Sequence, residues 1–324
     1  MTRRSSTSWG LDLSTNPRKC AAVAIRWDLG RPRVVNVKTR LTPEEIVDEI
    51  AATDDHFAVD VPFGWPDTFV QFIATHQHGQ QQPPGDRDAW RKETLARRLT
   101  DERLRQHRAL PLPASFDRLG KTAVMWSAIE FDLAARGVRF DRAGSVGRVC
   151  ETYPTAVLAA WHLDKKKPPL DLIERAFPFL DLEDHRSSLA GDDARDALIC
   201  SLTARAHALG LTVAPNANEL EQANREGWIH VMEEDPRQLI TDTSWIKLRF
   251  SPPDQRSLDE DGPKRTFDYY REDGSPPSCL DELGLILGTS LHGAAETILN
   301  YSHPAAVPRH LSREAWDIAT HSGR

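Results

Sequence analysis

The sequence predicts an α/β protein with a mixed five-stranded sheet, in which three antiparallel strands precede two parallel ones, flanked by helices and followed by a C-terminal extension. Three observations lead to this prediction. Three short apolar runs with tight connections open the chain, and such connections join antiparallel strands. A helix then leads into a fourth apolar run, which is a crossover to a parallel strand. Beyond Val231 the composition becomes rich in Pro, Gly and acidic residues, which is typical of loops or disorder.

Local signals mark where the elements begin and end. Asn16-Pro17 is a turn signal between the first two strands. Thr42 is expected to cap the first helix, because Pro43 follows at the first helical position. Gly210 is a natural end for the last long helix. We expect strands at residues 8–14, 20–28, 33–40, 57–61 and 146–152, and helices from residue 43 and at 67–76, 88–106, 120–136, 153–163 and 192–210.

The chain is expected to divide at Val231 into a domain over residues 8–231 and an acidic, Pro-rich extension of unknown role over residues 232–324. In the extension we expect only an edge strand at 245–250 and a helix at 293–300. The formal net charge of −7 is uneven, with 31 Lys+Arg against 32 Asp+Glu in residues 1–231 and 10 against 16 in residues 232–324. The first region is therefore compatible with a polyanionic partner.

Composition and motifs exclude several classes of protein. No apolar stretch approaches the roughly 20 residues that cross a bilayer, and the N-terminus has no signal-peptide core, so we expect a cytoplasmic protein with no membrane association. The four cysteines lie far apart without CxxC spacing, which indicates buried thiols rather than disulfides or a zinc knuckle. No HExxH, P-loop or GxSxG motif is present.

Acidic residues lie at the ends of the predicted strands and at the start of a helix. Asp12 is in the first strand, Asp60 ends the fourth and Glu151 is near the end of the fifth. If the first and fourth strands are parallel neighbours, all three reach the same edge of the sheet. Asp193 and Asp196, three residues apart, share a helix face. Oxygen ligands without His or Cys favour Mg²⁺ or Mn²⁺, and two such ions serve in-line phosphoryl displacement.

Each acid also has a purely structural interpretation. Asp12 alone fits an edge or turn position, and Glu151 alone could bond to nearby backbone. Asp192 and Asp193 are favoured on a first helical turn by the helix dipole, and Asp192, directly after Gly191, is interpreted as the N-cap. The joint pattern favours a metal site more strongly than any single residue does.

Six short motifs occur in a characteristic order: GLDLS at 10–14, AVDVPFGWP at 58–66, RLTD at 98–101, ETYP at 151–154, DDARDAL at 192–198 and GWIHV at 227–231. Over roughly residues 8–231 the chain resembles the DUF429 family, predicted nucleases of the ribonuclease H-like fold. The DxxDAL of residues 193–198 is also similar to the last active-site helix of RuvC-type Holliday junction resolvases. The resemblance implies a ribonuclease H-like sheet. It also implies that Asp12, Asp60, Glu151, Asp193 and Asp196 bind metal and carry out catalysis. The extension after Val231 departs from the family pattern.

Two residues are candidates for substrate contacts. Arg98, in the RLTD motif of an Arg-rich helix, is the best candidate for a phosphate contact, although a solvated helix face also explains this region. Trp65, in the loop after Asp60, can stack on a base or pack under the loop. Lys165-Lys166-Lys167 is interpreted as a solvated turn.

The leading functional hypothesis is a divalent-metal-dependent nuclease or phosphodiesterase acting on nucleic acid or a nucleotide. The alternatives are a catalytically silent ribonuclease H-like binding module and an actin-like-superfamily kinase. The kinase loses ground because such enzymes need a Gly-rich turn between the first two strands, and residues 14–19 contain no glycine. The oligomeric state is left open.

Overall fold

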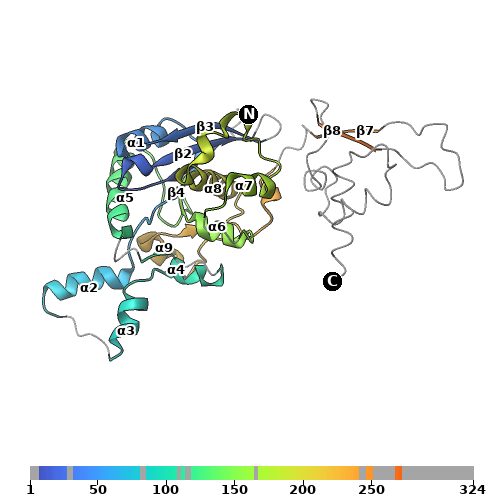
Figure 1. The fold of residues 1–324 in the computed structure, drawn as a ribbon. Coiled ribbons are helices and arrows are strands. Elements are labelled where there is room, and N and C mark those ends of the chain that lie inside the picture. Colours follow the sequence, from blue (N-terminus) through green and yellow to red (C-terminus); the bar gives the residue numbers. More distant parts are fainter. Residues whose placement is uncertain are drawn as a thin grey trace, which may run out of the picture. The chain divides into compact units, whose positions relative to one another are not determined.

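A computed structural model of the 324-residue chain describes residues 7–27, 32–80, 85–107, 111–113, 118–163, 167–240, 246–250 and 267–271. The chain forms two compact units (Figure 1). The first comprises Met1–Asp28, Arg33–Ile173 and Leu182–Leu239, and the second Leu29–Pro32, Glu174–Asp181 and Ile240–Arg324. The candidate functional residues all belong to the first unit.

The first unit is built on a mixed sheet of six strands in the order β3-β2-β1-β4-β5-β6. The first three strands are antiparallel, and β4, β5 and β6 add in parallel to β1. The α/β class, the antiparallel opening and the parallel crossover are thus confirmed, whereas the expected number of five strands was wrong. The strands are β1 Thr7–Asp12, β2 Ala21–Arg26, β3 Arg33–Thr39, β4 His56–Asp60, β5 Val149–Thr152 and β6 Ile229–His230.

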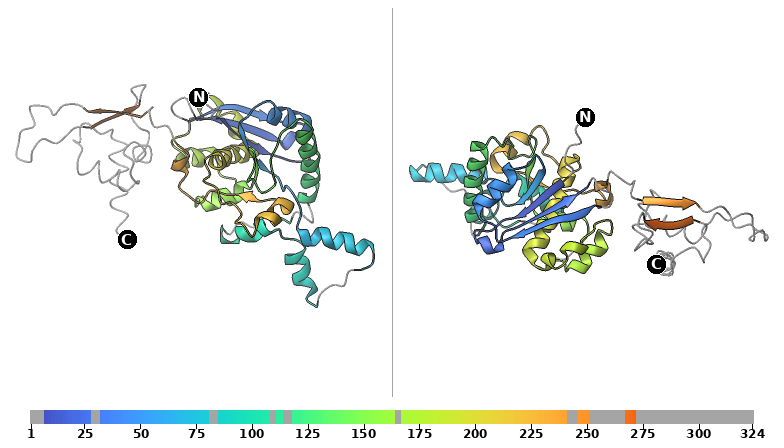
Figure 2. Two further views of the ribbon diagram at one scale, coloured as in Figure 1. Left: turned by 180° about the vertical axis from the view of Figure 1, so that it is seen from behind. Right: turned by 90° about the horizontal axis from the view of Figure 1, so that it is seen from above.

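Helices cover both faces of this sheet (Figure 2). Helices α1 (Pro43–Ala51) and α5 (Arg118–Ala135) pack on one face over a hydrophobic core that contains Leu11 and Val59. Helix α8 (Asp192–Ala208) packs on the other face and has buried residues on several sides. Since successive side chains of a strand alternate between faces, each strand residue is assigned to the α1/α5 face or to the α8 face.

Close packing of β1 against α8 depends on a residue without a side chain. A Cβ on Gly10 would collide with the Ala197 carbonyl oxygen and the Ser201 amide. Two residues before Gly10 in the strand, the carbonyl oxygen of Ser8 accepts a hydrogen bond from the Ser201 hydroxyl at 2.8 Å. Gly10 and Ser8 therefore face α8, and so does Asp12, the next residue but one in the strand.

Helix α1 begins where the sequence predicts. The Thr42 hydroxyl accepts a hydrogen bond from the Glu45 amide, and the Glu45 carboxylate accepts one from the Thr42 amide at 2.8 Å. This reciprocal pair is a capping box, which satisfies two backbone donors at the helix start.

The helix expected over residues 88–106 is interrupted. The structure has α3 (Arg87–Ala89), a wide turn at Trp90–Thr94, α4 (Leu99–Arg103) and a tight turn at Leu104–His107. The break occurs because Arg98 is extended, with φ −81° and ψ 162°, and its amide donates to Asp101 rather than to a preceding helical turn. The remaining helices are α2 Asp67–Gln77, α6 Pro154–Ala160, α7 Leu170–Ala176 and α9 Leu220–Glu226, of which α7 and α9 were not expected.

In the second unit, the edge strand expected at 245–250 is found as β7 (Ile246–Phe250), which pairs antiparallel with β8 (Phe267–Arg271). The helix expected at 293–300 and Cys279 lie outside the described residues. Within the described ranges, Cys20, Cys150 and Cys200 are free and buried, as expected. No helix in the described part of the chain is long and apolar enough to cross a membrane.

Candidate metal centre

Asp12 and Asp60 are cross-strand neighbours. They are the last residues of β1 and β4, and the parallel register of the two strands places them directly opposite each other. Paired residues in adjacent strands point to the same face, so both carboxylates lie on the face that packs against α8. The predicted inner pair on adjacent parallel strands is therefore present at the carboxyl edge of the sheet.

The first turns of α8 bring two more carboxylates to this pair. The charges of Asp60, Asp196 and Asp193 all raise the pKa of Asp12, and the charges of Asp196 and Glu151 raise that of Asp60. Gly10 determines this placement, because it holds α8 close to β1 just before Asp12. Asp12, Asp60, Asp193 and Asp196, here called the aspartate cluster, thus lie together although they come from three separate elements.

Three carboxyl groups of the aspartate cluster have raised pKa values. Burial, followed by Asp60, Asp196 and Asp193, raises the pKa of Asp12 to about 9. Burial likewise raises the pKa of Asp60 well above its ordinary range and that of Asp196 to about 6. Carboxylates that repel one another and lack solvent take up protons unless a cation binds, so the donor set suits a hard divalent ion.

The carboxylates do not have ligand geometry as they stand. Among the residues that the structure describes, no group of three or more His, Cys, Asp and Glu could hold a metal ion. The aspartate cluster would hold an ion only after its side chains move. Asp193 and Asp196 lie at the start of a helix, where rotamer changes leave the backbone in place.

A lysine that the sequence interpretation assigned to a solvated turn lies beside the cluster. Lys167 Nζ is 2.9 Å from the Asp192 carboxylate, and its charge lowers the pKa of Asp12 and Asp196. Asp192 is the first residue of α8 and also pairs with Arg195, whereas Gly191 is the N-cap, so the expected cap role of Asp192 was wrong. No spacing or motif in the sequence marks Lys167 as part of this site.

Glu151 points to the other face of the sheet from the aspartate cluster, although its charge raises the pKa of Asp60. In β5 it aligns with Val59, and Thr152 is the residue that aligns with Asp60. Its carboxylate therefore points to the α1/α5 face, where both oxygens are bound by Arg98 at 2.7 and 2.9 Å. Oε2 also accepts the Phe63 amide at 2.9 Å. Burial raises the pKa of Glu151, although Arg98 opposes this rise.

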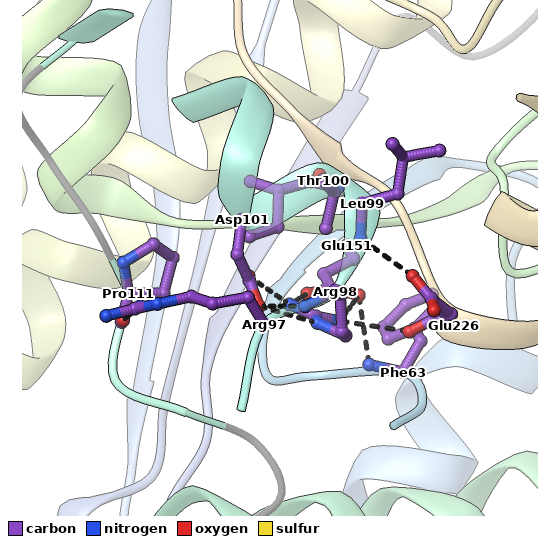
Figure 3. Close-up of polar contacts among 10 residues, drawn as sticks. Phe63, Arg97, Arg98, Leu99, Thr100, Asp101, Pro111, Glu151 and Glu226 are labelled. Carbon is purple, nitrogen blue, oxygen red and sulfur yellow. Dashed lines mark hydrogen bonds and ion pairs between the residues drawn. The ribbon is translucent and has the colours of Figure 1, made fainter. Parts of the chain in front are cut away.

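Arg98 is the centre of a buried ion-pair network (Figure 3). Its guanidinium donates to Asp101 at 3.1 Å, to both oxygens of Glu151 and to the Glu226 carbonyl oxygen at 3.1 Å. Burial lowers the pKa of Arg98, but the carboxylates of Asp101 and Glu151 outweigh this effect and raise it. A charged group out of water needs this degree of pairing and hydrogen bonding.

The last residue of α9, Glu226, and the glycine that follows it are part of the same network. The Glu226 carboxylate accepts the Leu99 amide at 2.7 Å and the Asp67 amide at 2.8 Å. Gly227 has φ +91°, and a Cβ there would lie 2.5 Å from Glu151 Oε2 and 3.0 Å from Arg98 Nη1. Glycine is therefore required at this position for both its backbone angle and its proximity. Glu226 was missed by the sequence interpretation, since it directly precedes the GWIHV motif.

The two predicted substrate contacts differ in accessibility. Arg98 is only 2% exposed and its guanidinium is already hydrogen-bonded inside the protein, so in this conformation it does not reach a substrate phosphate. Trp65 is half-buried in the loop after β4, so its role as a base-stacking residue stays a prediction.

Replacing Arg98 by Met should strongly destabilise the protein. Glu151 and Asp101 would remain buried without their cation, a loss that costs about 3–5 kcal/mol. The matched control is Arg105→Met, because Arg105 pairs with Glu93 and Glu102 at an exposed site, where water screens the charges and the loss of a pair changes stability little. Urea unfolding measures both, and equal losses in the two variants would contradict a central role for Arg98.

The metal-free protein should lose stability as the pH rises. The folded-state pKa values of Asp12 and Asp196, about 9 and about 6, lie above the ordinary value of 3.8. Such groups stabilise the fold fully below their unfolded-state pKa, and this contribution is lost as the pH rises through the folded-state pKa. Thermal unfolding in EDTA should give a lower Tm at pH 9 than at pH 6.

Asp12→Asn should flatten this decline and raise the Tm at pH 9 by about 2 °C or more, which corresponds to about 1 kcal/mol for a domain of this size. Asp132→Asn, at an exposed site on α5, is the control and should follow the unmodified protein. A decline of equal steepness in all three proteins would show that the aspartate cluster is not electrostatically strained.

Comparison with known proteins identifies the family. A family model described as "Protein of unknown function (DUF429)" matches residues 10–220, which is more than half of the 324-residue chain. Comparisons with curated proteins and with solved structures gave no match. The match covers the aspartate cluster, Arg98 and Glu151. The chain therefore belongs to the DUF429 family.

Proposed function

We propose that this protein is a divalent-metal-dependent nuclease or related phosphodiesterase with a ribonuclease H-like fold. The observation that carries the proposal is the Asp12–Asp60 pair at the carboxyl edge of β1 and β4, facing the first turns of α8. The carboxyl edge of parallel strands is where ligands bind in open α/β sheets. With Asp193 and Asp196, four carboxylate side chains can supply oxygen ligands at this edge.

The ribonuclease H-like assignment is supported by the strand order. The first five strands are arranged as β3-β2-β1-β4-β5, with β2 antiparallel to both of its neighbours, which is the arrangement expected from the resemblance. The additional β6, two residues long, extends the parallel side. It does not change the positions of β1 and β4, which hold the inner aspartates.

The residues of the cluster have separate roles in this proposal. Asp12 and Asp60 are fixed by their strands and would bind Mg²⁺ or Mn²⁺ from the sheet side. Asp193 and Asp196 would bind the ions from the α8 side. When bound, two such ions would activate the attacking water and stabilise the leaving oxygen of a phosphodiester. Lys167, with a side chain 61% exposed, places a positive charge beside the cluster, which favours an anionic substrate.

Two observations favour a second candidate, a catalytically silent binding module. No described group of acidic side chains has ligand geometry, and Glu151, which the family resemblance assigns to the metal, is held in the Arg98 network. In that case the aspartates would be neutralised by protons rather than by metal. The kinase hypothesis gains nothing, because the β1–β2 turn is a short Pro17–Lys19 helical turn without glycine.

Cleavage assays on single-stranded, double-stranded and branched DNA and RNA, with Mg²⁺ or Mn²⁺, test the proposal. Cleavage of at least one substrate should depend on the metal and should be lost in Asp60→Asn, because the inner pair is broken. Asp132→Asn should retain it. Cleavage that persists in Asp60→Asn would refute the assignment, and the absence of cleavage on every substrate would favour the binding module.

A further inference from the structure

A small cavity lies at the carboxyl edge of the sheet, next to the aspartate cluster. Its volume is about 140 Å³. Asp60 and the two residues that follow it form one side, and Glu151, Thr152 and Tyr153 form another. Leu119 and Thr122, from the first turns of α5, also line it. The cavity thus lies just beyond the ends of β4 and β5.

Tyr153 connects the cavity with the aspartate cluster. It lines the cavity, and its ring is partly buried. Burial raises the pKa of Tyr153, and the charges of Asp60 and Asp196 raise it further, so the ring lies within electrostatic reach of both carboxylates. Asp60 itself lines the cavity and belongs to the aspartate cluster, so a molecule in the cavity lies beside the cluster at Asp60.

We propose that this cavity binds the base of an unpaired nucleotide whose phosphate lies at the aspartate cluster. The proposal rests on the proposed function and specifies its substrate class: a single strand or a free nucleotide, rather than an intact duplex. A base that is paired and stacked cannot enter a cavity without leaving the helix, which costs a few kcal/mol. An unpaired base enters without that cost.

The size and lining of the cavity fit one planar base. Sites for drug-sized ligands occupy roughly 300–1,000 Å³, so 140 Å³ is suited to a single small ring system. Leu13, Val61, Pro62 and Leu119 provide apolar walls, and Tyr153 provides an aromatic ring on which a base can stack. The Thr122 hydroxyl can donate a hydrogen bond to the edge of a base or accept one from it.

The Arg98 network fixes the floor of this cavity. Arg98 and Glu151 both line it, yet each is only 2% exposed and bound to the other. Their charges are therefore satisfied within the protein, and the cavity presents mainly apolar surface to a ligand. The cavity therefore suits an uncharged ring, although the ionised side chains of Arg98 and Glu151 line it.

The test compares two ligands that differ only in the base. Dissociation constants for adenosine 5′-monophosphate and ribose 5-phosphate are measured by calorimetry on the full chain, once with Mn²⁺ and once with EDTA. The nucleotide should bind about tenfold more tightly or better, which is the range expected for one stacked base. A single-stranded oligonucleotide should also bind more tightly than a closed hairpin duplex of the same composition, because its bases are unpaired, and equal binding of the two would contradict the preference for unpaired bases.

Thr122→Trp should fill the cavity and remove the preference for the nucleotide over ribose 5-phosphate. Lys121→Trp, at an exposed position one residue earlier in α5, should keep it. Equal binding of the two ligands by the unmodified protein, or a preference unchanged in Thr122→Trp, would overturn the cavity proposal while leaving the metal site intact. If Mn²⁺ changes the dissociation constant of neither ligand, the proposed function fails. The difference between the two ligands in EDTA then decides by itself whether the cavity binds a base.

Discussion

The buried guanidinium of Arg98 is the interaction on which the carboxyl edge of this sheet depends. It binds the carboxylates of Glu151 and Asp101 and the carbonyl oxygen of Glu226, and it thereby connects β5, α4 and the end of α9. Glu151 in turn holds the loop after β4 through the Phe63 amide. Four of the short sequence motifs, AVDVPFGWP, RLTD, ETYP and GWIHV, thus meet at one network whose charges are paired inside the protein.

The opposite face of the same edge has acidic charge without such pairing. Burial and neighbouring carboxylates raise the pKa of Asp12, Asp60 and Asp196, and Lys167, a cation beside them, is itself paired with Asp192. The acidic residues that were predicted to form one metal site therefore fall into two groups with different roles. Glu151 and Arg98 hold the loops, and the aspartate cluster supplies oxygen donors that are stable as anions only when a cation neutralises them.

Much of this arrangement follows from the sequence, and the exceptions have physical causes. The neighbouring positions of Asp12 and Asp60 follow from the crossover, and the shared face of Asp193 and Asp196 follows from helical spacing. The face of Glu151 does not follow, because it depends on the register of β5, and a shift of one residue moves a side chain to the other face. β6 is only two residues long, too short to show an alternating pattern of apolar and polar residues. The break before α4 comes from the hydrogen bond of the Arg98 amide to Asp101, which helix propensities do not predict.

Direct titration with Mn²⁺ tests most sharply whether the aspartate cluster is a metal site. Calorimetry at pH 8 should show saturable binding to the unmodified protein, and Asp12→Asn and Asp196→Asn should each weaken it by more than about tenfold. Glu151→Gln, measured at a temperature where circular dichroism shows the fold intact, should retain it, because Glu151 faces Arg98. Unchanged affinity in Asp12→Asn, or loss of binding in folded Glu151→Gln alone, would contradict this account.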